Sequence, residues 1–226
     1  AFAYHRSRLF YEALPLYDLC VTTKSYETET YRQNGARKII TCTQGFDPAV
    51  HHPVVPFEEK QGVVFIGHRE DNREKILEGL LKKNISVTLA GIKWEPFAQR
   101  HKDNPKLRYL GKGIFGAAYT EAISGALLGL GFISRIVPEL HTTRTFEIPA
   151  SGTALVTERN AETEKIFNEG DVYFVNDDDA YLACIEEALD NKVKLKEITD
   201  RGYQRVITGG YDYRSILQKI LKEISF

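Results

Sequence analysis

The stretch from Glu139 to Gly152 holds the densest set of chemically useful side chains in this sequence. It runs Glu-Leu-His-Thr-Thr-Arg-Thr-Phe-Glu-Ile-Pro-Ala-Ser-Gly. The spacing predicts a helix over 141–150 that stops at the glycine, a residue suited to a left-handed helix end. A helix that begins near Thr142 would point Thr142, Thr143 and its first N–H groups at an anion, and Arg144 would add positive charge.

Glu147 would then lie on the first turns of that helix, as a carboxylate fixed on a rigid element. Such a carboxylate can accept hydrogen bonds from two sugar hydroxyls. The alternative is an ion pair between Glu147 and Arg144, three residues apart on a surface helix. Phe146, Ile148 and Pro149 favour the binding role, because they predict a poorly solvated site in which an unpaired carboxylate is costly.

Two glycine-containing loops offer further sites for an anion. Gly67, His68 and Arg69 follow an apolar run of strand length, so a phosphate could approach the backbone while His68, Arg69 or Arg73 neutralises it. Lys112 stands between two glycines after a later strand, where it could hold an anion or leave the backbone free to contact a flat base. Plain turns with solvated charges are the alternative at both loops.

The elements that must position these loops alternate between strand and helix. Strands are predicted at 18–23, 38–43, 62–67, 86–90, 107–110, 126–133, 153–157 and 171–175. Helices are predicted between most of them, and one is expected to be capped by Asp71 with Glu74 in reply. This alternation predicts a parallel sheet covered by helices on both faces, since parallel strands need crossovers. Ligands bind beyond the carboxyl ends of such strands, where the three loops lie.

A proline-rich stretch without periodicity, 44–61, divides the chain. We assign residues 1–47 to the C-terminal part of an N-terminal domain, 48–61 to an interdomain linker and 62–226 to a second domain with its C-terminal helices. The two strands before the linker cannot bury a core alone, so they are expected to end a domain whose beginning is missing. They should pair outside the sheet that contains residues 63–66, with the linker as hinge.

Composition excludes several classes of protein. Hydrophobic residues make up 42% and charged residues 27%, and the net charge of -1 gives no overall basic field for nucleic acid. The longest apolar stretch, 123–133, is too short to span a bilayer. The 3 cysteines are too few for a disulfide framework and are expected to be buried thiols in a reducing, cytoplasmic compartment.

The segment 144–158, Arg-Thr-Phe-Glu-Ile-Pro-Ala-Ser-Gly-Thr-Ala-Leu-Val-Thr-Glu, resembles the group 1 glycosyltransferases related to the spore-maturation CgeB proteins. Phe65–Gly67, Tyr17–Thr23 and Gly45–Pro48 fit the same family. The resemblance implies an α/β protein of the GT-B type. Its doubly wound, parallel-sheet (Rossmann-like) C-terminal domain, residues 62–226, would be the nucleotide-sugar donor-binding domain. Residues 1–47 would be a remnant of the N-terminal, acceptor-side Rossmann-like domain.

The resemblance also implies roles for individual residues. Retaining GT-B relatives carry two glutamates spaced like Glu139 and Glu147, so Glu147 would bind the donor ribose, while Glu139 and His141 are the catalytic candidates. This sequence departs from those relatives after the first glutamate, where Leu140-His-Thr-Thr replaces a Gly-Phe-Gly-like stretch. The donor-binding residues on this basis are Gly67, His68, Arg69, Arg73, Lys112, Thr142, Thr143, Arg144 and Glu147.

The expected activity is transfer of a sugar, of the hexosyltransferase type, from a UDP- or GDP-sugar to a glycan, lipid or protein acceptor in cell-surface glycan biosynthesis. A nucleotide-sugar epimerase and a non-catalytic nucleotide-sugar binding module are the alternatives. We expect no cofactor and no metal, with Asp177, Asp178 and Asp179 as a helix cap. Peripheral membrane contact would come through the missing N-terminal domain.

Overall fold

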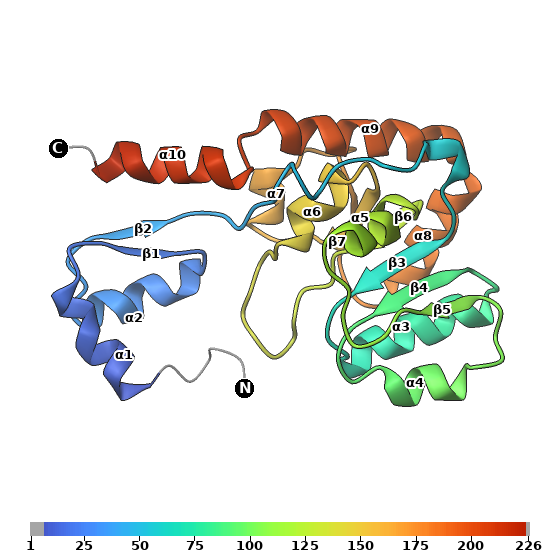
Figure 1. The fold of residues 1–226 in the computed structure, drawn as a ribbon, viewed down its shortest axis with the longest axis horizontal. Coiled ribbons are helices and arrows are strands. Elements are labelled where there is room, and N and C mark those ends of the chain that lie inside the picture. The colour runs from blue at the N-terminus through green and yellow to red at the C-terminus, as the bar shows by residue number, and fades with distance from the viewer. Residues whose placement is uncertain (1–6, 225–226) are drawn as a thin grey trace.

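Two separate parallel sheets organise the computed structural model, which describes residues 7–224 (Figure 1). The small sheet pairs β1 (Cys20–Thr22) with β2 (Ile39–Thr41). The large sheet has the order β5-β4-β3-β6-β7-β8, and each neighbouring pair in it is parallel. Its strands are β3 (Val63–Ile66), β4 (Val87–Ala90), β5 (Leu107–Tyr109), β6 (Leu128–Leu130), β7 (Ala154–Glu158) and β8 (Tyr173–Val175). The doubly wound sheet predicted from the sequence is confirmed.

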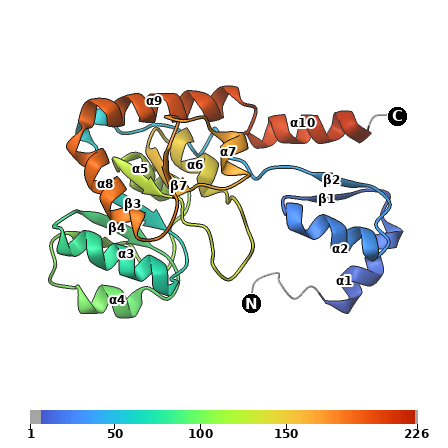
Figure 2. The same cartoon turned by 180° about the vertical axis from the view of Figure 1, so that it is seen from behind.

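Helices cover both faces of the large sheet (Figure 2). They are α3 (Asp71–Lys82), α4 (Glu95–Arg100), α5 (Ala117–Ser124), α6 (Arg144–Ala150), α7 (Thr163–Ile166), α8 (Ala180–Asp190) and α9 (Lys192–Thr208). The last helix, α10 (Tyr213–Ile224), extends away from the large sheet. The alternation of β3 shows why two layers are needed. Val63 and Phe65 are buried in the core with α3 and α8, while Val64 is buried on the other face with α5 and α6.

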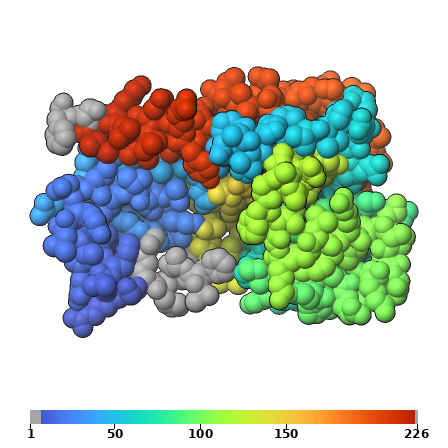
Figure 3. All heavy atoms as spheres, in the orientation of Figure 1, coloured from blue at the N-terminus to red at the C-terminus, as the bar shows by residue number. Residues whose placement is uncertain are grey.

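The small sheet packs with α1 (Arg8–Ala13) and α2 (Thr28–Gln33), and its strands do not pair with the large sheet. Contacts with the rest of the chain lie near α10, where Lys38 Nζ donates to the carbonyl of Glu223 at 2.5 Å. In Figures 1 and 3, α10 extends away from the large sheet and lies alongside the part of the chain that holds β1 and β2. The sequence did not predict a second set of contacts. Lys24 forms an ion pair with Glu139, and Ser25 Oγ donates a hydrogen bond to Glu162 Oε1 at 2.5 Å.

The segment 44–61 is packed along the large domain. Phe46 is buried, and its backbone pairs with Asp212 ahead of α10. The N–H groups of Val54 and Val55 donate to Ser124 Oγ at 2.9 and 3.0 Å, and buried Lys60 donates to the Ser124 carbonyl. A hinge role for this segment stays a prediction, and any motion in it would have to break these contacts.

Three local expectations were wrong. The strand predicted at 126–133 pairs only over Leu128–Leu130, because the chain leaves the sheet after Gly131. The helix predicted over 141–150 begins at Arg144 instead, after a longer loop. The expected capping pair at the start of α3 is not formed: Glu70 occupies the cap position, and Glu74 instead accepts from Arg69 and Arg100.

The cap at α8 is confirmed, since Asp177 Oδ1 accepts from the Ala180 N–H at 2.9 Å.

Of the cysteines, Cys20 is buried and Cys42 and Cys184 are partly buried. Within residues 7–224, no helix combines the length and the apolar character needed to cross a bilayer.

Candidate functional site

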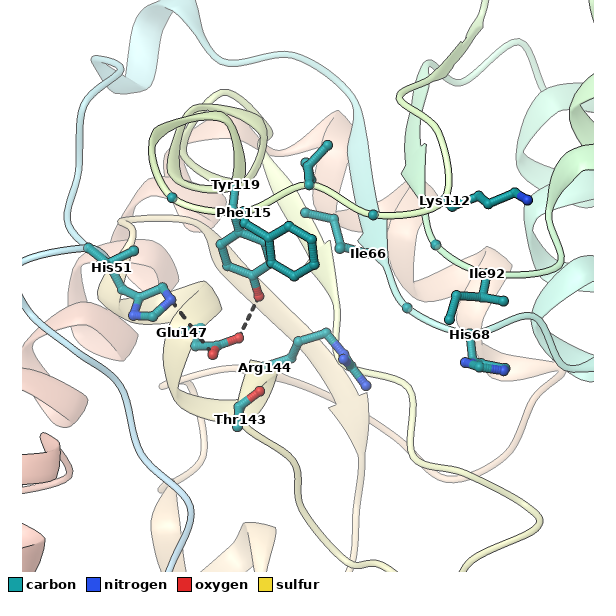
Figure 4. Close-up of a pocket in the computed structure, with 16 residues that line it drawn as sticks. His51, Ile66, His68, Ile92, Lys112, Phe115, Tyr119, Thr143, Arg144 and Glu147 are labelled. Carbon is teal, nitrogen blue, oxygen red and sulfur yellow. Dashed lines mark hydrogen bonds and ion pairs between the residues drawn. The ribbon is translucent and has the colours of Figure 1, made fainter. Parts of the chain in front are cut away.

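A cavity of about 430 Å³ opens at the carboxyl ends of β3, β4 and β5 (Figure 4). This size is within the range of small-molecule sites, roughly 300–1,000 Å³. Its walls come from the loops that follow the three strands, from α5 and α6, and from the segment before β3. The lining residues that matter below are Gly67, His68, Gly91, Lys112, Phe115, Tyr119, Thr143, Arg144, Glu147 and His51.

Glu147 is held at the floor of the cavity by two side chains. Its Oε2 accepts a hydrogen bond from the Tyr119 hydroxyl, and its Oε1 lies 3.6 Å from His51 Nε2. The Glu147 side chain is only 12% exposed. Burial, with the neighbouring carboxylate, raises the pKa of Tyr119 well above 10, so this phenol stays a hydrogen-bond donor. Each oxygen keeps a further lone pair for a ligand hydroxyl.

Arg144 is a cation without an acidic partner. Among the residues that the structure describes, none forms an ion pair with it, and its buried Nε has no hydrogen-bond partner. The pairing with Glu147 that the sequence left open as an alternative is not present. The guanidinium lies against Gly67, where an added Cβ would be 3.6 Å from Arg144 Cζ. A partly buried, unpaired positive charge in a cavity favours an anionic ligand.

The loop after β3 is held by the end of β4 and by Trp94, which precedes α4. Trp94 Nε1 donates to the Gly67 carbonyl at 2.8 Å, and the Gly67 N–H donates to the Ala90 carbonyl at 2.9 Å. Gly91 has a φ of +140°, and a Cβ there would lie 1.9 Å from the Gly67 oxygen. Only glycine fits this contact, which keeps the backbone of Gly67 at the wall of the cavity.

His68, the next residue of this loop, also lines the cavity. Burial and the nearby cations Lys93 and Arg73 lower its pKa from 6.5.

The loop between β5 and α5 is longer than the sequence analysis recognised. Residues 111–116 run Gly-Lys-Gly-Ile-Phe-Gly, a Gly-x-Gly-x-x-Gly spacing between a strand and a helix, and this spacing was the signal that could have identified the whole loop. Gly111 and Gly116 have φ values of +96° and +57°. The loop holds Phe115 at the cavity with 86% of the residue exposed. Lys112 lies at the rim, with its Nζ 3.4 Å from Glu95 Oε1.

The cavity thus brings together Gly67, His68, Lys112, Thr143, Arg144 and Glu147 of the predicted donor-binding set. It does not bring in Arg69, Arg73 or Thr142. Arg69 pairs with Asp71 at 2.8 Å and with Glu74. Arg73 is buried, pairs with Glu70 at 2.7 Å and donates to the His68 carbonyl at 2.9 Å, so it supports the loop from behind. Thr142 is buried, and no group among residues 7–224 forms a hydrogen bond with its hydroxyl.

Glu139 and His141 lie away from this cavity. Glu139 lines a second hollow of about 390 Å³ and pairs with Lys24. His141 is buried, and both ring nitrogens are engaged: Nε2 accepts from the Gln44 N–H at 3.1 Å, and Nδ1 lies 2.6 Å from Glu162 Oε2. His141 therefore joins three segments of the chain, and its nitrogens are not directed at a ligand.

The chain matches one family model and is similar to several solved structures. A family model described as glycosyl transferase-like matches residues 69–222. HepE from Anabaena in complex with UDP-glucose is similar in structure, with a TM-score of 0.71 and 13% identity over 94% of this chain and 65% of that one.

Sucrose-phosphate synthase from Thermosynechococcus elongatus has a TM-score of 0.68 and 15% identity over 96% of this chain and 60% of that one. A glycosyltransferase from Rickettsia africae has a TM-score of 0.65 and 15% identity over 97% of this chain and 67% of that one. This chain spans 60 to 65% of the first two neighbours. A search of curated protein sequences finds no match.

Proposed function

Because this chain belongs to the glycosyl transferase-like family, we propose that its cavity at the carboxyl ends of β3, β4 and β5 holds the nucleoside diphosphate of a sugar donor. The fold is of the GT-B type, which the structural neighbours share. The protein would act as a hexosyltransferase on a UDP- or GDP-sugar. UDP is the first candidate, because the similar HepE was solved with UDP-glucose. The narrower resemblance to CgeB-related enzymes belongs to the same proposal.

The unpaired Arg144 beside the fixed carboxylate of Glu147 is the observation that carries the proposal. A nucleoside diphosphate is an anion joined to a ribose diol, and these two side chains match its two halves. Glu147 would accept hydrogen bonds from the ribose hydroxyls, while Arg144, with Thr143, would contact the diphosphate. The exposed ring of Phe115 would then stack on the base.

The chemistry would follow from this placement. As the sugar leaves the diphosphate, negative charge builds on the phosphate oxygens, and a fixed cation such as Arg144 stabilises that charge without a metal. The acceptor would approach from the side of the small sheet, past the second hollow that contains Glu139. His141, with both nitrogens bonded, would hold this junction together, so we assign it a supporting role and leave Glu139 as the catalytic candidate.

Calorimetric titration with UDP and GDP tests the donor site. Glu147→Ala should weaken binding of the preferred nucleotide by about 1.5–3 kcal/mol, the range for hydrogen bonds to a charged group. Arg144→Gln should weaken the binding of inorganic pyrophosphate as well as the binding of the nucleotide. Glu121→Ala, an exposed carboxylate on α5, is the matched control and should bind like the wild type. Unchanged affinity in a folded Glu147→Ala protein would remove Glu147 from the site.

Product analysis separates the three candidate functions. A transferase releases the nucleoside diphosphate from a UDP- or GDP-sugar when an acceptor or water receives the sugar. An epimerase returns a changed nucleotide sugar without releasing the diphosphate, and a binding module returns the donor unchanged. Release of the diphosphate at a rate that falls in Glu147→Ala would support the transferase.

A further inference from the structure

The histidine pair before β3 is split between two environments. His51 is 9% exposed and lines the cavity, whereas His52 is exposed and does not. His51 closes a tight turn, in which its N–H donates to the Asp47 carbonyl at 2.7 Å. The turn is tied to α5, because Thr120 Oγ1 donates to the Val50 carbonyl at 2.5 Å. The ring therefore has a fixed position.

The ring of His51 is also fixed in orientation. Nδ1 lies 3.1 Å from both the backbone nitrogen and the carbonyl oxygen of Asp47, so Nδ1 faces the turn and Nε2 faces Glu147. Nε2 lies 3.6 Å from Glu147 Oε1. The ring meets Tyr119 edge to face, with centroids 5.6 Å apart. His51 and Tyr119 thus flank Glu147, one facing each carboxylate oxygen, as Figure 4 shows.

We propose that His51 is a positioning residue for the donor ribose. The Nε2 edge of its ring, 3.6 Å from Oε1, and the Tyr119 hydroxyl confine the Glu147 carboxylate so that the remaining lone pairs face the two ribose hydroxyls. The inference rests on the proposed nucleotide site and adds a residue to it from outside the large sheet. The segment that connects the two sheets is thereby a working part of the donor site.

Two substitutions and a matched control isolate this role. His51→Phe keeps a ring in the turn and removes both ring nitrogens, His51→Gln keeps a polar side chain with N–H donors, and His52→Phe makes the same change at the exposed neighbour. Dissociation constants are measured for UDP, for the 2′,3′-dideoxy analogue of UDP and for inorganic pyrophosphate. The last two ligands lack the hydroxyls that Glu147 would bind.

His51→Phe should weaken UDP binding by about three- to tenfold, because the polar contact between Nε2 and Glu147 is lost, and should change binding of the other two ligands by less than about twofold. His51→Gln should recover part of the loss, and His52→Phe should behave like the wild type. Equal losses for all three ligands, with a lower melting temperature, would overturn the proposal in favour of a purely structural turn.

The inference and the proposed function fail in different ways. If Glu147→Ala loses the preference for UDP over the dideoxy analogue while His51→Phe keeps it, the donor site stands and the role of His51 is refuted. If the wild-type protein binds UDP and the analogue equally, the ribose role of Glu147 fails, and the role of His51 fails with it.

Discussion

Substitution of Gly91 by alanine tests the contact that fixes the wall of the cavity. Gly91 follows β4, and its φ of +140° is a conformation that side chains rarely adopt. A Cβ would lie 1.9 Å from the Gly67 oxygen and 2.7 Å from the Gly67 carbonyl carbon. Because both neighbours are backbone atoms, the two strand ends must move apart to make room for a methyl group.

The cost has two parts. The backbone conformation costs about 1–3 kcal/mol for a residue other than glycine. The overlap with Gly67 adds about 1–3 kcal/mol, the range for overpacking a tight interior. Gly111→Ala carries only the first part, since its φ is +96° and a Cβ there meets nothing within 4 Å. Gly91→Ala should therefore be less stable than Gly111→Ala by about 1–3 kcal/mol.

Urea unfolding and thermal melting of both variants give the measurement. For a chain of this size the difference corresponds to a melting temperature roughly 2–12 °C lower in Gly91→Ala than in Gly111→Ala. UDP affinity should fall further in Gly91→Ala, because the displaced Gly67 lies beside Arg144. If the two variants lose the same stability within about 0.5 kcal/mol, the close approach of Gly91 to Gly67 does not constrain the fold, and the reasoning is refuted.

Three other predictions concern charge. Burial lowers the pKa of Lys60 to about 8 from 10.5, so the unfolded chain binds more protons between these values and stability should rise with pH there. The free energy of unfolding of the wild type, minus that of Lys60→Met, should increase from pH 8 to pH 10, and a flat difference would contradict it.

Burial raises the pKa of Glu158 above 4.5, so the folded state binds the extra proton and wild-type stability at this site should fall as pH rises through the raised pKa. Glu158→Gln should gain on the wild type over that window in urea titrations at a series of pH values, and parallel pH profiles would count against it. Nucleotide binding should survive a chelator, since Arg144 supplies the positive charge; dependence on magnesium or manganese in the same calorimetric assay would reverse this prediction.

The order of strands and helices follows from local patterns, which is why the large sheet was predictable. Val63 to Ile66 is a continuous apolar run between glycines, and such a run has few alternatives to a strand covered on both faces. Local patterns failed where tertiary contacts decide. Glu74 fits a helix cap by spacing, yet Arg69 and Arg100 both reach it in the folded chain.

The candidate site divides in the same way. Arg144 and Glu147 lie on one short helix, so their spacing alone placed them together. His51 and Tyr119 reach Glu147 only through the fold, and no pattern near either residue indicates a carboxylate partner. Arg73 has the charge expected of a phosphate ligand, but its position on the inner face of α3 directs it to Glu70. Residue type and loop position indicated the region, and packing selected the side chains.

The hydrogen bond from Trp94 to Gly67 has a practical consequence. The sequence contains 1 tryptophan, so the indole emission of these 226 residues comes from a single ring whose N–H donates to the backbone at the wall of the cavity. A ligand that shifts Gly67 changes the surroundings of that N–H and, with them, the intensity or colour of the emitted light. Occupancy of the cavity can therefore be followed optically, in real time and without a label, on the unaltered chain.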